Sequence, residues 1–379
     1  NARKRKGETV RDSIAHVAMG ADAINFFQWR ASAFGAESFH SALVPHAGEN
    51  TKLFRQVCEL GAALKTLGDA GVQGTELELS DTAILFSAES EWATRSETLP
   101  SMKLNHWHDV RDWYRGFLDA GLRADVVPLA YDWTGYKAIV LPTVLSLSDE
   151  DVLRIADFAK AGGTVIVGYA AGLIDEHFHI GLGGYPGAGN GLLRDMLGIR
   201  SEEFNILGEE AEGEFSEISL SNGLTTRLWQ NDVTSVAADT TVLASYAGES
   251  AADWELERTP AITSRPYGNG TAIYVGCDLN RHDIAQLLKA LGSRWQELSA
   301  QPTESSQTPT YPTTDPRILH TIRRSADGST RFDFYLNRSN QPVAINGVEG
   351  DPIIAHRCET DAVGYTLNRN AILIAKTAC

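Results

Sequence analysis

Between residues 82 and 169, short apolar runs alternate with longer amphipathic segments, and this alternation limits the possible folds more than any other feature. The amphipathic segments 105–121 and 149–161 are predicted helices, the second capped by Ser148 with acidic residues in its first turn. The apolar runs are predicted strands at residues 82–86, 125–128, 138–142 and 164–169. Strands and helices alternating at this spacing predict an α/β fold, an open and mostly parallel sheet with helices on both faces.

The first 70 residues carry a shorter version of this pattern. A helix is predicted over residues 8–20, a strand over 23–30, a polar loop over 31–50 and a second helix over 51–67. A single strand cannot satisfy its own backbone hydrogen bonds, so we expect it to complete a larger sheet. We therefore expect the chain to begin inside a domain, and we expect exposed apolar side chains at Ile24, Phe26, Phe27 and Leu53.

The remaining sequence predicts shorter strands. Residues 204–265 contain short strands and polar turns, 267–276 form a hairpin turn leading into a strand, and 283–291 form a short helix. A linker rich in Pro, Thr and Ser follows at residues 301–315. Residues 316–379 alternate apolar and polar side chains, which predicts a small antiparallel β domain of about six strands.

Charge and cysteine usage exclude several classes of partner. The formal net charge of −16 argues against binding to nucleic-acid phosphates. No apolar run approaches the roughly 20 residues of a membrane span, and the N-terminus has no signal-peptide pattern. The widely spaced cysteines form neither a metal-binding pattern nor a disulfide framework, so we expect reduced thiols, no metal and a cytoplasmic protein.

Aromatic and hydrogen-bonding residues gather around the predicted strand 23–30. Phe27, Trp29 and Arg30 are followed in the loop by Glu37 and His40. An aromatic face can stack on the apolar face of a sugar ring, while a carboxylate and an imidazole bind its hydroxyl groups. The pattern thus indicates a sugar-binding site, and the alternative is a core aromatic strand beside a solvated Glu/His pair.

At this point the residues resemble a known family. Residues 20–30 (GADAINFFQWR) and 35–46 (GAESFHSALVPH) are similar to the last strand and last βα loop of the barrel of glycoside hydrolase family 42 β-galactosidases. Residues 138–142, 168–175, 183–187 and 192–199 are similar to the family's second domain. The resemblance follows the whole chain in order.

The resemblance implies three domains and a function. Residues 1–71 would be the last βα unit of a (β/α)8 TIM barrel. Residues 72–303 would be an α/β domain of flavodoxin or glutamine-amidotransferase type that forms a homotrimer, and residues 304–379 a small antiparallel β domain. The family hydrolyses terminal β-galactosides with retention and without a cofactor. On its pattern Phe27, Glu37 and His40 contact galactose, and Trp29 and Arg30 lie in the same motif.

The family's two catalytic glutamates have no counterpart in these residues. The nucleophile would lie about a dozen residues before Asn1 and the acid/base further upstream, so we expect this chain alone to be inactive. The alternative function is a catalytically silent oligomerisation module or a galactoside-binding module.

Other motifs carry less weight. The pairs His106/His108 and His177/His179 lack an obvious third metal ligand, and the glycine-rich segment 181–187 has no lysine that could reach a phosphate. No cysteine nucleophile follows the strand 164–169, which argues against amidotransferase chemistry.

Overall fold

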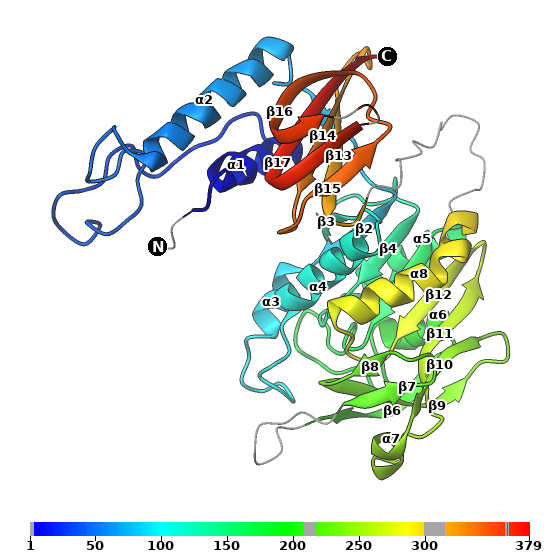
Figure 1. Cartoon of the computed structure of the whole chain (residues 1–379). Helices are drawn as coiled ribbons and strands as arrows, with labels where there is room; N and C mark the ends of the chain where they lie inside the picture. Colours follow the sequence, from blue (N-terminus) through cyan, green and yellow to red (C-terminus); the bar gives the residue numbers. More distant parts are fainter. Residues whose placement is uncertain (1–3, 208–216, 299–314, 361, 363) are drawn as a thin grey trace. The chain divides into compact units, whose positions relative to one another are not determined.

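The computed structural model describes residues 4–207, 217–298, 315–360, 362 and 364–379. The chain divides into two compact units, which are coloured differently in Figure 1. Unit 1 combines residues 1–79, in blue, with residues 308–379, in orange and red. Unit 2 is residues 80–307, from cyan to yellow.

Unit 2 is built on a nine-stranded mixed sheet with the strand order β3-β2-β4-β5-β12-β11-β10-β7-β8. The pairs from β3 to β12 are parallel and the pairs from β12 to β8 are antiparallel. The parallel strands are β2 Thr82–Phe86, β3 Asp125–Pro128, β4 Ala138–Leu141, β5 Thr164–Gly168 and β12 Gly270–Val275. The others are β7 Ile218–Leu220, β8 Thr225–Thr226, β10 Thr241–Ala247 and β11 Pro260–Tyr267. The predicted parallel sheet is confirmed, with an antiparallel extension at one edge.

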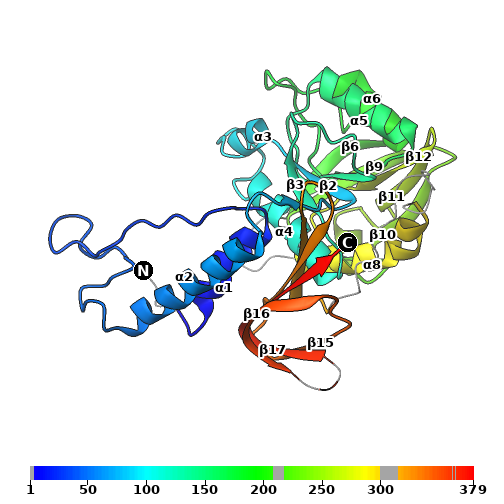
Figure 2. The same cartoon turned by 90° about the horizontal axis from the view of Figure 1, so that it is seen from above.

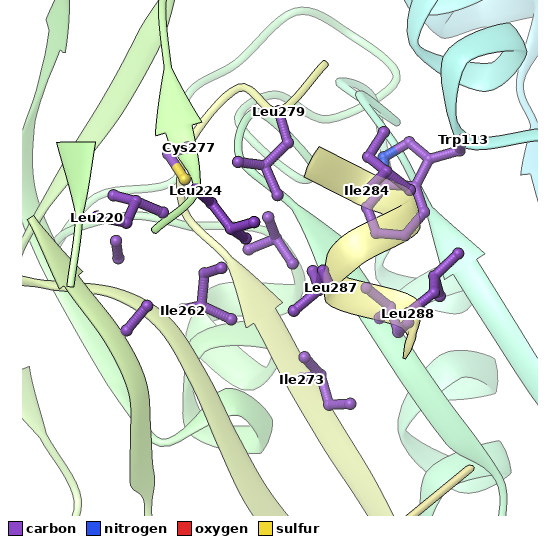
Figure 3. Packing of buried hydrophobic residues seen from close by; sticks show 14 of the residues in the cluster. Trp113, Leu220, Leu224, Ile262, Ile273, Cys277, Leu279, Ile284, Leu287 and Leu288 are labelled. Carbon is purple, nitrogen blue, oxygen red and sulfur yellow. The ribbon is translucent and has the colours of Figure 1, made fainter. Parts of the chain in front are cut away.

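Helices cover both faces of this sheet (Figure 2). On one face α4 (His106–Asp119) and α8 (Arg281–Leu298) pack on alternate residues of the central strands, such as Ile84 and Val140. Figure 3 shows Ile284, Leu287 and Leu288 of α8 in this core. On the other face α5 (Asp149–Ala161) and α6 (Leu192–Leu197) pack on the intervening residues, such as Leu85 and Ile139. Alternation along each strand thus supplies two apolar faces.

Smaller elements complete unit 2. They are α3 (Ala88–Ala93), α7 (Glu249–Asp253), the short 3-10 helix Gly189–Gly191, and a two-stranded sheet of β6 (Ile199–Ile206) and β9 (Trp229–Val236). The predicted cap of α5 is confirmed, because the Ser148 hydroxyl accepts from the Asp151 backbone and the Asp151 carboxylate accepts from the Ser148 backbone. No described helix is long and apolar enough to cross a membrane.

Unit 1 is an antiparallel sheet covered on one face by two helices. The order is β1-β13-β14-β17-β15, with β16 also paired to β17. The strands are β1 Glu76–Leu77, β13 Ile318–Arg324, β14 Thr330–Asn337, β15 Val343–Asn346, β16 Asp351–Thr360 and β17 Gly364–Ala378. The helices are α1 (Glu8–Ala18) and α2 (Lys52–Ala70), which lie side by side in Figures 1 and 2.

The N-terminal helices find a partner that the sequence analysis did not foresee. Val10 and Ile14 of α1 and Leu60 and Leu67 of α2 are buried in one cluster with Phe334 and other sheet residues. The first helices and the C-terminal strands therefore belong to one compact unit, formed by residues 1–79 and 308–379. Of the residues expected to be exposed, Ile24 and Leu53 are half-buried, whereas Phe26 and Phe27 are exposed.

The predicted strand 23–30 is wrong. Residues 23–29 have no regular secondary structure, and the segment pairs only through an isolated bridge between Arg30 and Val44. No described strand is available beside it, so its composition alone does not make a sheet. The predicted linker at 301–315 lies almost wholly outside the described residues.

Candidate functional site

The candidate site begins at a buried arginine that fixes the chain leaving α1. The Arg323 guanidinium of β13 is fully buried and donates to the backbone oxygens of Val17 and Ala21 at 2.9 Å and of Thr75 at 2.7 Å. It also pairs with the Asp22 carboxylate at 2.6 Å, which holds the pKa of Asp22 below its usual value. The segment that carries the candidate residues therefore starts from a fixed position on the sheet.

Beyond Asp22 the chain has no regular secondary structure and is held by a returning segment. The backbone oxygens of Gln28 and Trp29 accept from the N–H groups of Leu43 at 2.9 Å and Val44 at 2.7 Å, and the Ala31 N–H donates to Val44 at 2.9 Å. Val44 is fully buried. Two stretches joined by the loop 31–42 thus support each other without forming a regular sheet.

Phe27 and His40 come together across this loop. Their ring centroids lie 6.4 Å apart with the planes at 71°, an edge-to-face contact. The Phe27 side chain is 70% exposed, so its ring is available to a ligand. Glu37 lies in the same turn as His40, whose N–H donates to the Glu37 backbone oxygen at 2.9 Å.

Glu37 itself is exposed, and its carboxylate has no hydrogen-bond or ion-pair partner among the residues that the structure describes. Its oxygen atoms are free to accept from hydroxyl groups, and the neighbouring imidazole can donate or accept. The loop thus offers an aromatic face, an acceptor and an imidazole within one turn, which suits a small polyhydroxylated ligand.

The structure places Trp29 and Arg30 differently. The Trp29 ring packs edge-to-face against Phe54 of α2, with centroids 6.1 Å apart. The Arg30 guanidinium pairs with the Glu49 carboxylate at 3.3 Å. Both side chains are thus engaged by residues that follow the loop, and no described contact joins either of them to Phe27, Glu37 or His40.

Sequence reasoning missed several residues that shape this region. Arg323 and Asp22 anchor it, and His46 closes the loop through a 2.7 Å contact between its Nε2 atom and the Ser32 backbone oxygen. The partners of Arg323 lie between 248 and 306 residues away in the sequence, so no local pattern could have revealed them. A signal did exist at Phe34, an apolar residue in a polar loop, and it is 87% exposed.

The motifs outside this region play structural parts. His106 is fully buried, its Nε2 atom accepts from the Ser87 N–H at 2.9 Å, and burial lowers its pKa to about 4. His179 pairs with Asp175 at 3.1 Å. No group of residues that could hold a metal occurs in the described part of the chain.

A small cavity at the carboxyl end of the parallel strands of unit 2 holds a thiol and carboxylates. Its volume is about 10 Å³, and Cys277, Asp109 and Asp278 line it. Burial raises the pKa of the Cys277 thiol well above its usual value, so the thiol is protonated and is a poor nucleophile. We therefore still expect this domain to have no amidotransferase activity.

Family models match the chain in three consecutive parts. The model described as a β-galactosidase trimerisation domain matches residues 80–299. The chain belongs to the GH42 β-galactosidase family. Two further models of this family, described as β-galactosidase and β-galactosidase C-terminal domain, match residues 1–67 and 318–377.

Known members are similar over nearly the whole chain. The β-galactosidase BbgII of Bifidobacterium bifidum is 41% identical over 99% of this chain and 52% of its own length. A β-galactosidase of an Arthrobacter species is 36% identical over 94% of this chain and 47% of its own. The structure of a β-galactosidase from Rahnella sp. R3 aligns with a TM-score of 0.81 at 26% identity, over 99% of this chain and 52% of that one. The chain therefore spans about half the length of the relatives that it matches.

Proposed function

We propose that these residues are part of a β-galactosidase that hydrolyses terminal, non-reducing β-galactose residues with retention of configuration. The relatives named β-galactosidase, similar over nearly the entire chain, support the activity. The observation that carries the proposal at the level of the site is the exposed Phe27 ring against His40, with an unpaired Glu37 in the same turn.

In this proposal, the loop 31–42 and the segment before it form part of the subsite for the galactose ring. The Phe27 ring packs on the apolar face of the sugar, and Glu37 and His40 bind hydroxyl groups. Trp29 and Arg30 support the site without touching the sugar, because the Trp29 ring contacts Phe54 and the Arg30 guanidinium pairs with Glu49. These groups bind and orient the sugar, and none of them is placed as nucleophile or acid.

Retaining hydrolysis needs two carboxylates about 5–5.5 Å apart, one as nucleophile and one as acid/base. We propose that both of these catalytic glutamates lie outside these residues, which span about half the length of the relatives that they match. The finer architecture belongs to the same proposal: residues 1–71 end a TIM barrel, residues 72–303 form a flavodoxin-like domain, and residues 304–379 close the subunit. Numbered along the chain, the parallel strands of unit 2 have the order 2-1-3-4-5, which supports the flavodoxin-like part.

We further propose a homotrimer in the cytoplasm. The match of residues 80–299 to a trimerisation domain supports the trimer. Cys58, Cys277, Cys358 and Cys379 are all unpaired, which supports a reducing compartment.

The test compares this chain with a chimeric protein. In the chimera, the part of BbgII that precedes the region similar to this chain is joined to residue 1 of this chain. The chimera should hydrolyse an aryl β-galactoside and release β-galactose first, as nuclear magnetic resonance can detect. The chain alone should give no turnover. Turnover by the chain alone that is lost in Glu37→Ala would contradict the placement of the catalytic pair.

The second candidate is a galactoside-binding or oligomerisation module without chemistry. The unpaired, exposed Glu37 favours the galactoside-binding form of this alternative, because its carboxylate is free to accept from a hydroxyl group. A chimera that binds galactose but never cleaves a galactoside would support this alternative.

A further inference from the structure

The chain that returns from the loop 31–42 brings a histidine to the base of that loop. Backbone hydrogen bonds join the two ends of the loop, among them one from the Ala31 N–H to the Val44 oxygen at 2.9 Å. The chain then turns at residues 45–48, where the Gly48 N–H donates to the Pro45 oxygen at 2.8 Å. His46 lies in this turn, two residues after Val44.

The His46 side chain adds a further contact at the point where the loop begins. Its Nε2 atom lies 2.7 Å from the Ser32 backbone oxygen. A carbonyl oxygen can only accept a hydrogen bond, so Nε2 carries a proton and donates it. Ser32 directly follows Ala31, the residue paired with Val44. The imidazole therefore holds the loop just where it leaves the paired segment.

The turn that carries His46 is itself tied to α2. The Thr51 hydroxyl donates to the Gly48 oxygen at 3.2 Å and accepts from the Phe54 N–H at 3.2 Å, which caps the helix. Leu60 and Leu67 of α2 are buried in the cluster that includes residues of the unit 1 sheet. The imidazole of residue 46 thus links the loop to a helix with a packed core face.

The loop carries two of the groups that we place against galactose. Inside it, the Ser38 hydroxyl donates to the Gly35 oxygen at 2.8 Å, and the His40 N–H donates to the Glu37 oxygen at 2.9 Å. These short-range bonds keep residues 35–40 in one compact turn. They do not fix where that turn lies, because both partners of each bond belong to it. An attachment to the rest of unit 1 is needed for that, and the Ser32 contact supplies one.

We propose that His46 is a positioning residue for the galactose subsite, and that it acts by holding Ser32 so that Glu37 and His40 face the sugar. The inference rests on the proposed function of the loop. His46 does not contact the sugar in this arrangement, because its Nε2 proton is directed at Ser32. Binding groups that are held in place before the ligand arrives lose less entropy on binding. Removal of the hydrogen bond therefore weakens the binding of the sugar.

The experiment measures kcat/KM of the BbgII chimera on an aryl β-galactoside for two replacements of His46. The amide nitrogen of glutamine is as many bonds from Cα as Nε2 is in histidine. His46→Gln therefore keeps a donor for Ser32 and should stay within about threefold of the parent. His46→Met has a similar reach but no donor, and it should lower kcat/KM about tenfold. The control is His16→Met on α1, an exposed histidine, which should stay within about twofold of the parent.

A double replacement separates positioning from a general effect on the fold. In a Glu37→Ala background, His46→Met should lower kcat/KM by less than about threefold, because a residue that acts through Glu37 has less effect once that carboxylate is gone. A loss of about tenfold in both backgrounds would overturn the proposal. Equal losses in His46→Gln and His46→Met would overturn it as well, since the hydrogen bond would then not be the cause.

Hydrogen–deuterium exchange of the 379-residue chain tests the same contact without turnover. The backbone N–H groups of Ser38 and His40 should exchange faster in His46→Met than in the parent or in His46→Gln, while those of α1 should not change. Equal exchange in all three proteins would overturn the positioning role, whatever the activities are. A chimera without any turnover would instead overturn the proposed function, and with it the part of His46 in the subsite.

Discussion

At the scale of single residues, the Asp278 carboxyl group links the stability of unit 2 to pH. It follows β12, and burial, followed by the charge of Asp112, raises its pKa from 3.8 to about 6. The folded state therefore holds a proton that the unfolded state releases between about pH 4 and 6, so the stability from this group falls as pH rises through that range. We expect Asp278→Asn to raise the free energy of unfolding at pH 7 by about 1–3 kcal/mol and to have little effect near pH 4.

Urea titrations at the two pH values measure this difference. The control is Asp253→Asn, because Asp253 is exposed on α7. The free energy of unfolding of Asp253→Asn should equal that of the parent at both pH values. An Asp278→Asn protein no more stable than the parent at pH 7 would show that the buried carboxylate carries no such cost.

The sequence named the candidate residues, but it could not predict which of them lie together. Phe27 and His40 are in contact, and Glu37 lies in the same turn as His40. Trp29 and Arg30 belong to the same stretch of sequence but contact Phe54 and Glu49. Sequence spacing does not reveal which side of an irregular loop a side chain takes, because no helical or strand period applies there.

At the scale of elements, Arg323 joins β13 to the end of α1 and to the residue before β1. We expect Arg323→Met to lower the free energy of unfolding of unit 1 by about 3–5 kcal/mol, because it removes buried bonds to Val17, Ala21 and Thr75 and the ion pair with Asp22. Urea unfolding followed by circular dichroism measures the change.

Its neighbour Arg324 gives a matched control. Arg324 pairs with Glu78 at 2.5 Å, and its side chain is 36% exposed. Arg324→Met should cost less than about 1 kcal/mol, as is usual for a surface ion pair. Equal losses in the two variants would mean that the buried network around Arg323 has no special role.

Elements with a clear apolar period were predictable, and those that depend on distant partners were not. The strand 164–169 and the cap at Ser148 follow from local patterns, and both are confirmed. The segment 23–30 has the composition of a strand but lacks a strand beside it, and so it forms only the bridge from Arg30 to Val44. Tertiary context decides such cases, because a strand is stable only when it is paired.

At the scale of the whole molecule, the compact units of the structure and the ranges of the family models divide the chain differently. The family models separate residues 1–67 from 318–377, whereas the structure packs these regions as unit 1. Sequence patterns give the apolar faces of α1 and α2 but not the surface that they cover. Residues such as Phe332 and Ile372, some 300 positions away, supply that surface.

The central claim is that Phe27, Glu37 and His40 form part of a galactose subsite, and kcat/KM of the BbgII chimera on an aryl β-galactoside tests it most directly. Glu37→Ala and His40→Ala should each remove about 2–4 kcal/mol of transition-state stabilisation, a loss on the order of 30- to 800-fold in kcat/KM. The matched controls are Glu59→Ala on α2 and His16→Ala on α1, both exposed, which should stay within about twofold of the parent. Values for Glu37→Ala and His40→Ala as close to the parent as those of the controls would contradict the account.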